Sequence, residues 1–447
     1  IFVFYILEKE GLISLFFFYF YFMKALLLIF LLLFNYSFSQ ETVFELLNAN
    51  QTGVEFNNII EDKKEHNILL YANYYGGGGV GIADFDNDGL QDIYFGGNLV
   101  ADKIYRNLGN FKFTDKTLSS GINDNGSWSS GITIADVNND GLVDVYVSKE
   151  LYDDKPELRR NKLYINKGDF TFEESSKKWG VDVSARTRHA VFFDYNNDGH
   201  LDLYLLNQPP NPGSYSKFFG SDLTLPEYSL QLFKNTGNNS FIDVTKEAGL
   251  NRTGFPNSVV ASDLNQDGYV DLYVANDFDA PDFLYYNNGD GTFSYETESS
   301  LKHTSFYSMG VDSADINNDG ELDIMVVDMT AEDNFRLKSN MSGMNPSSFW
   351  KVVENGGHFQ YMFNSLQINN GDKTFSDVAQ YTKTSSTDWS WANLIADFDN
   401  DGLKDIYVTN GLLRDIRNTD ADKKVGQFVL KIADDYVKKN KSFDYNL

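Results

Sequence analysis

A nine-residue acidic loop that occurs six times constrains this chain more than any other feature. Each copy reads Asp-x-Asp/Asn-x-Asp-Gly-x-x-Asp, so positions 1, 3, 5 and 9 always carry a side-chain oxygen. In chain order these positions are Asp84, Asp86, Asp88, Asp92, Asp136, Asn138, Asp140, Asp144, Asp194, Asn196, Asp198, Asp202, Asp263, Asn265, Asp267, Asp271, Asp315, Asn317, Asp319, Asp323, Asp397, Asp399, Asp401 and Asp405.

This spacing is typical of a loop that binds a hard cation. Calcium takes about six to eight oxygen ligands, which alternate residues of a tight loop can supply together with a backbone carbonyl at position 7. The glycine at position 6 permits the positive φ of a sharp turn. An Asp-Asn-Gly turn without metal is the competing interpretation, and six copies favour calcium. We therefore predict up to six structural Ca²⁺ ions.

An EF-hand is a further alternative, and the sequence excludes it. An EF-hand loop needs a bidentate Glu at position 12. Position 12 is apolar in every copy: Phe95, Val147, Leu205, Val274, Val326 and Val408.

Charge and cysteine content exclude several classes of function. The formal charge of the 447 residues is −27, and the ligand positions of the loops account for twenty of the carboxylates. Such a chain lacks the positive surface that nucleic acid requires. There is no cysteine, which excludes disulfides, thiolate zinc sites, a cysteine nucleophile and a lipid-modified N-terminal cysteine. Calcium could stabilise the fold in place of disulfides.

The N-terminal region resembles an export signal. Met23-Lys24 precedes an apolar run over 25–34, and Ser37-Phe38-Ser39 offers small residues before Gln40, which is the pattern of a secretory signal peptide. A membrane anchor over 12–34 is long enough to span a bilayer, but Lys24 would lie in its middle. We expect residues 1–39 to be upstream sequence and a signal peptide. The mature protein would then be secreted, on the cell surface or periplasmic, with no stable membrane span.

Between the loops the chain repeats four short apolar runs. One run leads into each loop and one leaves it. A third ends in an Asn followed two residues later by Gly, at Asn107, Asn166, Asn235, Asn287 and Asn369. The fourth opens on Phe113, Phe172, Phe241, Phe293 or Phe375. Short β-branched and aromatic runs between Gly/Asn/Asp turns predict antiparallel strands. Four strands per unit predict an all-β propeller over residues 40–410, with insertions near 209–229 and 330–363.

The two ends of the array bear on the number of blades. Phe44 and Gly53 repeat the end of a unit before any loop has appeared, and no aromatic-x-Asn-x-Gly run follows the sixth loop. We expect six blades with a seventh position largely vacant and a further repeat encoded downstream. The alternative is a closed six-bladed ring in which 53–56 pairs with 406–408. We expect residues 411–447 to form a helical C-terminal segment, with an amphipathic helix over 419–437 against the propeller edge. A frayed terminal segment is the alternative.

The loops, the aromatic-x-Asn-x-Gly runs and the Gly-rich stretch 76–81 resemble the FG-GAP/VCBS repeat family, which includes the integrin α propeller. The order of features, including Thr387–Trp391, is similar to secreted bacterial VCBS-repeat proteins related to cartilage acidic protein. Those proteins carry an ASPIC/UnbV module, which has no counterpart before Leu447. The resemblance implies that the calcium loops are structural and that ligands bind on the other face.

Two functions follow as hypotheses. The first is a non-enzymatic binding or adhesion module for glycan or an extracellular protein, with exposed aromatic residues such as Tyr74, Tyr75, Tyr215 and Trp350 as candidates for contact. Packing in the core is the alternative for each of these aromatic residues. The second is a calcium-dependent polysaccharide lyase, which needs a base and a charge neutraliser. The basic residues that could serve are Arg186, Arg188 and His189, and more weakly Arg414 and Arg417. The alternative for the first three is a structural group held in salt bridges.

Overall fold

The structure is a computed structural model. It describes residues 23–24, 44–68, 70–71, 73–124, 126–209, 228–278, 280–339, 346–411 and 418–438. The chain divides into two compact units, residues 1–47 and 48–447. Every element discussed below belongs to the second unit. In the described ranges, none of the helices is long and apolar enough to cross a membrane. The predicted signal peptide lies almost wholly outside the described residues and stays a prediction.

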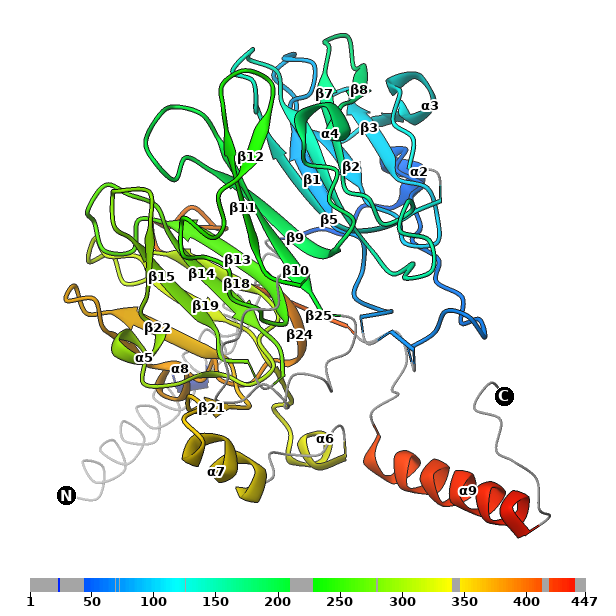
Figure 1. Cartoon of the computed structure of the whole chain (residues 1–447), viewed down its shortest axis with the longest axis vertical. Helices are drawn as coiled ribbons and strands as arrows, with labels where there is room; N and C mark the ends of the chain where they lie inside the picture. Colours follow the sequence, from blue (N-terminus) through cyan, green and yellow to red (C-terminus); the bar gives the residue numbers. More distant parts are fainter. Residues whose placement is uncertain are drawn as a thin grey trace, which may run out of the picture. The chain divides into compact units, whose positions relative to one another are not determined.

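The second unit is a β-propeller (Figure 1). Five sheets have four antiparallel strands each, and a sixth sheet has three. In order, the sheets contain β1 Val80–Ala83, β2 Asp92–Phe95, β3 Lys103–Asn107 and β4 Phe113–Asp115; β5 Trp128–Ala135, β6 Asp144–Glu150, β7 Lys162–Asn166 and β8 Phe172–Glu174; β9 Arg186–Phe193, β10 Asp202–Gln208, β11 Gln231–Asn235 and β12 Phe241–Asp243; β13 Pro256–Ser262, β14 Asp271–Asn276, β15 Phe283–Asn287 and β16 Phe293–Tyr295; β18 Val311–Ala314, β19 Asp323–Val326, β22 Ser365–Asn369 and β23 Phe375–Asp377; and β20 Met329–Thr330, β24 Asp388–Ala396 and β25 Asp405–Asn410.

The four-run pattern of the sequence is confirmed strand by strand. In the five four-stranded blades each acidic loop joins the first two strands, the third strand ends at the motif Asn, and the fourth opens at the motif Phe. In the three-stranded sixth sheet the loop joins β24 to β25. Register is regular around the loops, so that Ala83 lies opposite Asp92 in the first blade and Ala135 opposite Asp144 in the second. The inner strands of blades 2, 3, 4 and 6 are longer than the apolar runs indicate.

The hydrophobic core lies between the blades. The inner strands contact one another in the order β1, β5, β9, β13, β18 and β24. Five apolar clusters each draw on two consecutive blades; one joins Tyr94 and Ile104 of the first blade to Val145 and Tyr164 of the second. The others join blades 2 and 3, 3 and 4, 4 and 5, and 5 and 6. Burial between neighbouring sheets therefore holds the array together.

A short helical turn follows the outer strand of most blades, which the sequence reasoning did not anticipate. These turns are α3 Thr117–Ser120, α4 Ser176–Trp179, α5 Thr297–Ser300 and α8 Ala379–Thr382. Gly121 ends α3 at φ +82°, and a Cβ there would lie 2.7 Å from the carbonyl oxygen of Phe172 in the next blade. Gly53 ends α2 (Ala49–Thr52) in the same way, against the carbonyl of Phe113. The segment around Gly53 thus packs on blade 1 as Gly121, Gly180 and Gly249 pack on the blade that follows each of them.

The outer faces of the first and sixth blades are exposed. Tyr94, Tyr146, Tyr204 and Tyr273 occupy one position of the second strand and are fully buried, whereas the equivalent Tyr407 is 44% exposed. Val80 and Ile82 on β1 are also exposed. Among the described residues, no ladder joins 53–56 to 406–408, because β25 pairs only with β24. The described strands therefore do not form the closed six-bladed alternative.

The insertion in the fifth blade folds into small elements. A parallel pair joins β17 (Thr304–Ser305) to β21 (Gln360–Tyr361), and two helices, α6 (Asn334–Ser339) and α7 (Pro346–Glu354), lie between β20 and β21 in the chain. Trp350 on α7 is 54% exposed, as expected. The other insertion falls largely outside the described residues, and Tyr215 with it.

Two expectations about packing are wrong. Tyr74 is fully buried, because its ring stacks on Trp128 at 5.3 Å and its hydroxyl donates to the carbonyl of Glu61. The C-terminal helix α9 (Thr419–Lys438) forms as predicted, but Val425 and Phe428 on its apolar face are exposed. The contact of α9 is with α6, where the Thr419 hydroxyl lies 3.5 Å from the Lys338 carbonyl.

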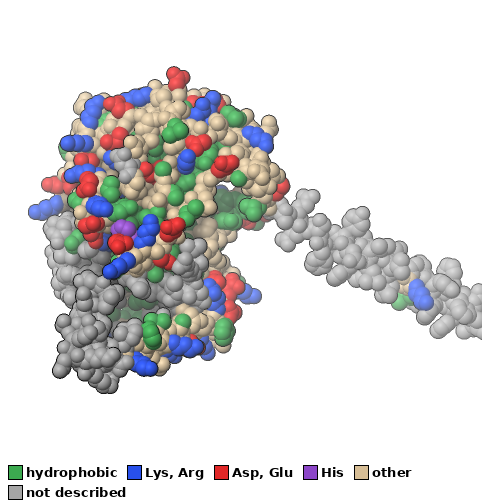
Figure 2. Space-filling view, turned by 90° about the vertical axis from the view of Figure 1, so that its right-hand side faces the viewer, with side chains coloured by type: hydrophobic (Ala, Val, Ile, Leu, Met, Phe, Trp, Pro, Cys, Tyr) green, Lys and Arg blue, Asp and Glu red, His purple; other side chains and the backbone are tan. Residues whose placement is uncertain are grey.

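Figure 2 shows acidic and basic side chains interspersed on one face of the molecule, without a continuous basic patch.

Candidate functional site

The six acidic loops have the same internal geometry. In the first loop the Asp84 carboxylate accepts the backbone N–H groups of Asp88 and Gly89 at 3.0 and 2.7 Å. The other five loops repeat both bonds. Position 5 then accepts the N–H of position 7, at 2.9 Å from Leu90 to Asp88. Position 4 has positive φ in every copy. The backbone is therefore folded so that the side chains of positions 1, 3 and 5 turn inward.

Carboxylate oxygens converge in two of the loops. One oxygen each of Asp84, Asp86 and Asp88 lie within 4.8 Å of one another, and so do oxygens of Asp397, Asp399 and Asp405. The Oδ1 atom of Asp86 is buried without a hydrogen-bond partner among the described residues. Like charges this close repel unless a cation neutralises them. These residues therefore fit an oxygen-ligated divalent cation.

Three of the four loops with Asn at position 3 hold that side chain differently, whereas the amide nitrogen of Asn265 in the fourth has no hydrogen-bond partner among the described residues. The amide nitrogens of Asn138, Asn196 and Asn317 donate to the carboxylate at position 5, at 2.8 to 3.0 Å. Each amide oxygen accepts the backbone N–H of position 5. These amides occupy the space in front of the carboxylate, which is where a cation would sit.

The Asp at position 9, a predicted metal ligand, also accepts hydrogen bonds from the backbone of the fold. Asp92 accepts the N–H of Phe85 at 2.9 Å and the N–H of Asn107 at 2.7 Å, which ties the loop to the third strand. Burial raises the pKa of Asp92 to about 6 and those of Asp144, Asp202 and Asp271 to about 7, against the effect of the backbone amides. A bound cation would favour the ionised form of these carboxyl groups.

Neighbouring loops are joined through position 4, a role that the sequence reasoning missed. The Asn87 amide donates to the carbonyl of Gly141 in the next loop at 3.0 Å. Asn139, Asn197, Gln266 and Asn318 make the same contact with the following loop. The signal was available, since position 4 is Asn or Gln in all six copies. The loops form a connected row along one end of the propeller.

Basic residues of the third strand reach two of the loops. Arg106 lies 2.5 Å from Asp86 and 3.1 Å from Asp88, and Lys234 lies 3.2 Å from Asp198. Arg106 neutralises part of the charge at position 3 of the first loop. The sixth loop has no such neighbour among the described residues, although it also carries four carboxylates.

The motif Asn is a staple between blades. The Asn235 side chain, 1% exposed, donates to the carbonyls of Val137 in the preceding loop and Leu201 in its own loop, and accepts the N–H of Gly237. The same bonds occur at Asn166, Asn287 and Asn369. Asn107 lies in the first blade and makes only the contacts within its own blade.

The basic cluster considered for a lyase is divided among different contacts. Arg186 pairs with Asp153, and Arg188 lies 3.4 Å from the buried Glu150. His189 belongs to a cavity described below. Arg414 and Arg417 lie outside the described residues. The charge neutralisers proposed for a lyase are thus held in ion pairs.

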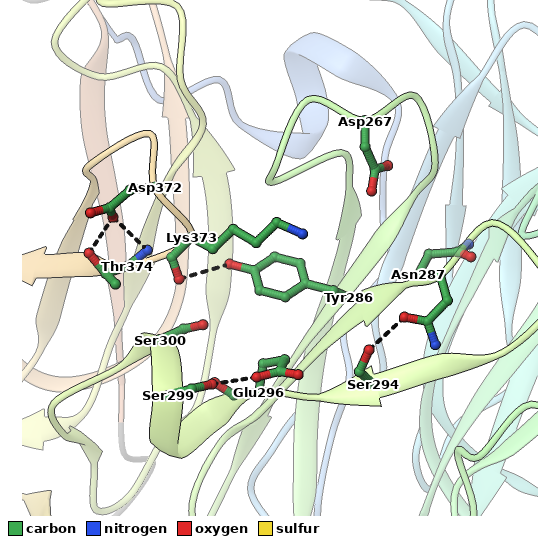
Figure 3. A pocket seen from close by; sticks show the side chains of 11 residues that line it. Asp267, Tyr286, Asn287, Ser294, Glu296, Ser299, Ser300, Asp372, Lys373 and Thr374 are labelled. Carbon is green, nitrogen blue, oxygen red and sulfur yellow. Dashed lines mark hydrogen bonds between the residues drawn. The ribbon is translucent and has the colours of Figure 1, made fainter.

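A polar cleft of about 510 Å³ lies between the fourth and fifth blades (Figure 3). Asp267, Glu296 and Lys373 are among its lining residues. Its polar groups bond mostly to each other: the Tyr286 hydroxyl faces the Lys373 carbonyl at 3.4 Å, and the Ser294 hydroxyl donates to Asn288 at 2.6 Å. Because most of these polar groups already bond to each other, few remain to form hydrogen bonds with a ligand.

These features define a repeat β-propeller with one acidic loop per blade. The FG-GAP-like repeat pattern matches residues 67–147, 153–205, 222–274, 263–326 and 352–408, which is more than half of the chain. The chain therefore belongs to the FG-GAP-like repeat family, as its motifs suggested.

The chain is also similar to cartilage acidic protein 1. It is 22% identical over 379 residues to the human protein, with 74% of this chain and 56% of that protein covered. It is 24% identical over 354 residues to the Xenopus tropicalis protein, with 74% and 48% covered. The chain spans about half the length of these relatives.

Two solved structures are similar in part. A lectin from Agrocybe aegerita, described as recognising non-reducing terminal N-acetylglucosamine, has a TM-score of 0.43 at 17% identity, covering 74% of this chain and 73% of the lectin. The V. cholerae biofilm matrix protein Bap1 has a TM-score of 0.32 at 14% identity, covering 66% and 38%.

Proposed function

We propose that this protein is a secreted, calcium-stabilised binding module that recognises a glycan or an extracellular protein. The observation that carries the calcium part is the unpartnered, buried Asp86 Oδ1 beside the carboxylates of Asp84 and Asp88. Five other loops share that backbone geometry. Positions 1, 3, 5 and 9 would hold the ion, and calcium would supply charge neutralisation rather than reaction chemistry.

The arrangement of the loops supports a structural role for the metal. The first five loops each bond to the next loop through position 4, and in blades 2 to 5 the motif Asn ties the blade to the preceding loop. A cation that orders one loop would therefore also steady the carbonyls that its neighbours use. The binding surface for a partner is then free to lie at the opposite end of the inner strands, which also suits a propeller that acts as a scaffold.

A metal count and a binding screen test the proposal. The protein, desalted into calcium buffer, is expected to retain several Ca²⁺ per chain by elemental analysis and to bind members of a glycan or extracellular-protein array. Absence of bound calcium would contradict the metal part. Release of unsaturated product from uronic-acid polysaccharide, followed by ultraviolet absorbance, would contradict the non-enzymatic part. For secretion, the mature N-terminus by mass spectrometry is expected at Gln40.

A further inference from the structure

A cavity of about 280 Å³ lies on the axis of the propeller, where the inner strands converge. The five inner strands from β5 to β24 border it, through residues such as Ser130, His189, Ser258, Val311, Trp391 and Asn393. Its volume is close to the lower limit of small-molecule sites, about 300 Å³. Most lining residues belong to the first halves of their strands, whereas the acidic loops follow the last residues. Asp136 lies six positions after Ser130, or about 20 Å along an extended strand.

Three buried polar atoms of cavity-lining residues have no hydrogen-bond partner among the described residues. They are His189 Nδ1, Ser258 Oγ and Asn393 Oδ1, from three different strands. Asn393, 4% exposed, donates its amide nitrogen to the Met325 carbonyl at 2.9 Å, so only its oxygen lacks a partner. Buried polar atoms are rarely left unpaired in folded proteins. These three atoms belong to residues that line the cavity, whereas the polar groups of the cleft in Figure 3 bond mostly to each other.

The other polar residues around the cavity are already satisfied and give it a fixed shape. Asn257 donates to the Ser308 carbonyl at 2.9 Å, and the Ser130 hydroxyl donates to the Thr187 carbonyl at 2.6 Å. The Trp391 indole N–H donates to the Gly411 carbonyl, which holds the ring plane. A preformed cavity loses little conformational entropy when a ligand enters.

The charges around the cavity favour a neutral ligand. Arg188 lines it, but its guanidinium lies 3.4 Å from Glu150, so the pair carries no net charge. Burial, and then the charge of Arg188, lower the pKa of His189 to about 4, so the imidazole is neutral near pH 7. The unpartnered atoms include the Asn393 oxygen, which can only accept. A carboxylate or phosphate brings acceptors alone, whereas a hydroxyl both donates and accepts.

Apolar side chains complete the lining. Trp391 and Met309 border the cavity together with Val311. An aromatic face carries negative charge density and attracts the weakly positive C–H groups of a ligand. The required molecule thus has several hydroxyl groups and one C–H-rich face, and it fits a cavity of this volume.

We propose that the axial cavity binds one neutral sugar residue, with its hydroxyls bonded to Asn393, Ser258 and His189 and a C–H face against Trp391. This inference rests on the proposed glycan-binding function and assigns that function to a site. The sugar enters from the end of the propeller that lies away from the acidic loops.

Saturation-transfer NMR and calorimetry on the full calcium-loaded chain test this site, with the methyl glycosides of glucose, galactose and N-acetylglucosamine as probes. At least one glycoside is expected to bind. Ser258→Ala should weaken that binding by up to about tenfold, the effect of one lost hydrogen bond, at unchanged melting temperature, because the hydroxyl has no protein partner. Trp391→Phe tests the contact of the indole ring with the sugar and should also weaken binding. The matched control is Ser294→Ala in the cleft between blades 4 and 5, which should bind normally.

The outcomes separate the site from the function. Absence of binding by all three glycosides, or unchanged affinity in both Ser258→Ala and Trp391→Phe, would overturn the axial site. If an array still shows glycan binding in that case, the proposed function survives and only its location is wrong. If the array shows no glycan binding while an extracellular protein binds, the proposed sugar site is wrong and the function is protein recognition.

Discussion

Replacing the motif Asn of an interior blade should destabilise the protein more than the same change in the first blade. Asn235→Ala removes three hydrogen bonds, including the one at 2.9 Å to Val137 in the neighbouring blade. Asn107→Ala removes two, both within its own blade. Because a buried hydrogen bond contributes about 1 kcal/mol net, the expected losses are about 3 and at most about 2 kcal/mol.

Urea unfolding in calcium, followed by tryptophan fluorescence, measures both variants. The midpoint of Asn235→Ala should fall below that of Asn107→Ala, with similar slopes if the compactness of both states is unchanged. The difference isolates the bond between blades, since the contacts within the blade are common to the two positions. Equal losses would refute the role of the motif Asn as an interblade staple.

Three further outcomes are expected. Asp399→Asn should weaken calcium binding at its loop more than Asn317→Ala does at the fifth loop, since ligand charge raises affinity; calorimetry that finds equal effects would speak against ligation at position 3. Arg106→Ala should strengthen calcium binding by the first loop, because it frees Asp86 from an ion pair; weaker binding would show that Arg106 supports the site. Burial raises the pKa of Asp282 to about 7, so the folded state holds a proton that the unfolded state has lost, and stability falls as pH rises from about 4 to 7. Asp282→Asn should remove up to about 1.4 kcal/mol per pH unit of that slope, measured by urea unfolding at several pH values, and an unchanged slope would contradict the assignment.

The repeat made most of the fold predictable. Strand order, the third-strand Asn and the fourth-strand Phe follow from a pattern that recurs at fixed places, and local rules suffice for hairpins of this kind. Burial was harder to predict, because it depends on which blade covers which face. Tyr74 and Tyr407 show this: the first was expected outside and stacks on Trp128, whereas the second repeats a buried tyrosine yet is exposed.

Of the candidate sites, the metal loops could be predicted from the sequence and the axial cavity could not. The metal loops lie within single stretches of sequence, so their spacing could be read directly. The axial cavity draws Ser130, Ser258 and Asn393 from strands far apart in the chain. Nothing in the local sequence of these residues sets them apart, and only the propeller brings them together. The side-chain amide at position 4 of the loops was visible as a repeated Asn or Gln. The backbone carbonyl that it bonds belongs to the loop of the next blade, which the local sequence does not show.

Thermal unfolding with and without calcium tests the central claim most directly. Ligand that binds only the folded state stabilises by mass action, by about 2.7 kcal/mol per site at a hundred times the dissociation constant. The melting temperature should therefore drop clearly in chelator, recover with Ca²⁺, and recover poorly with Mg²⁺, which demands a tighter octahedral site. Identical melting curves with calcium and with chelator would contradict the account.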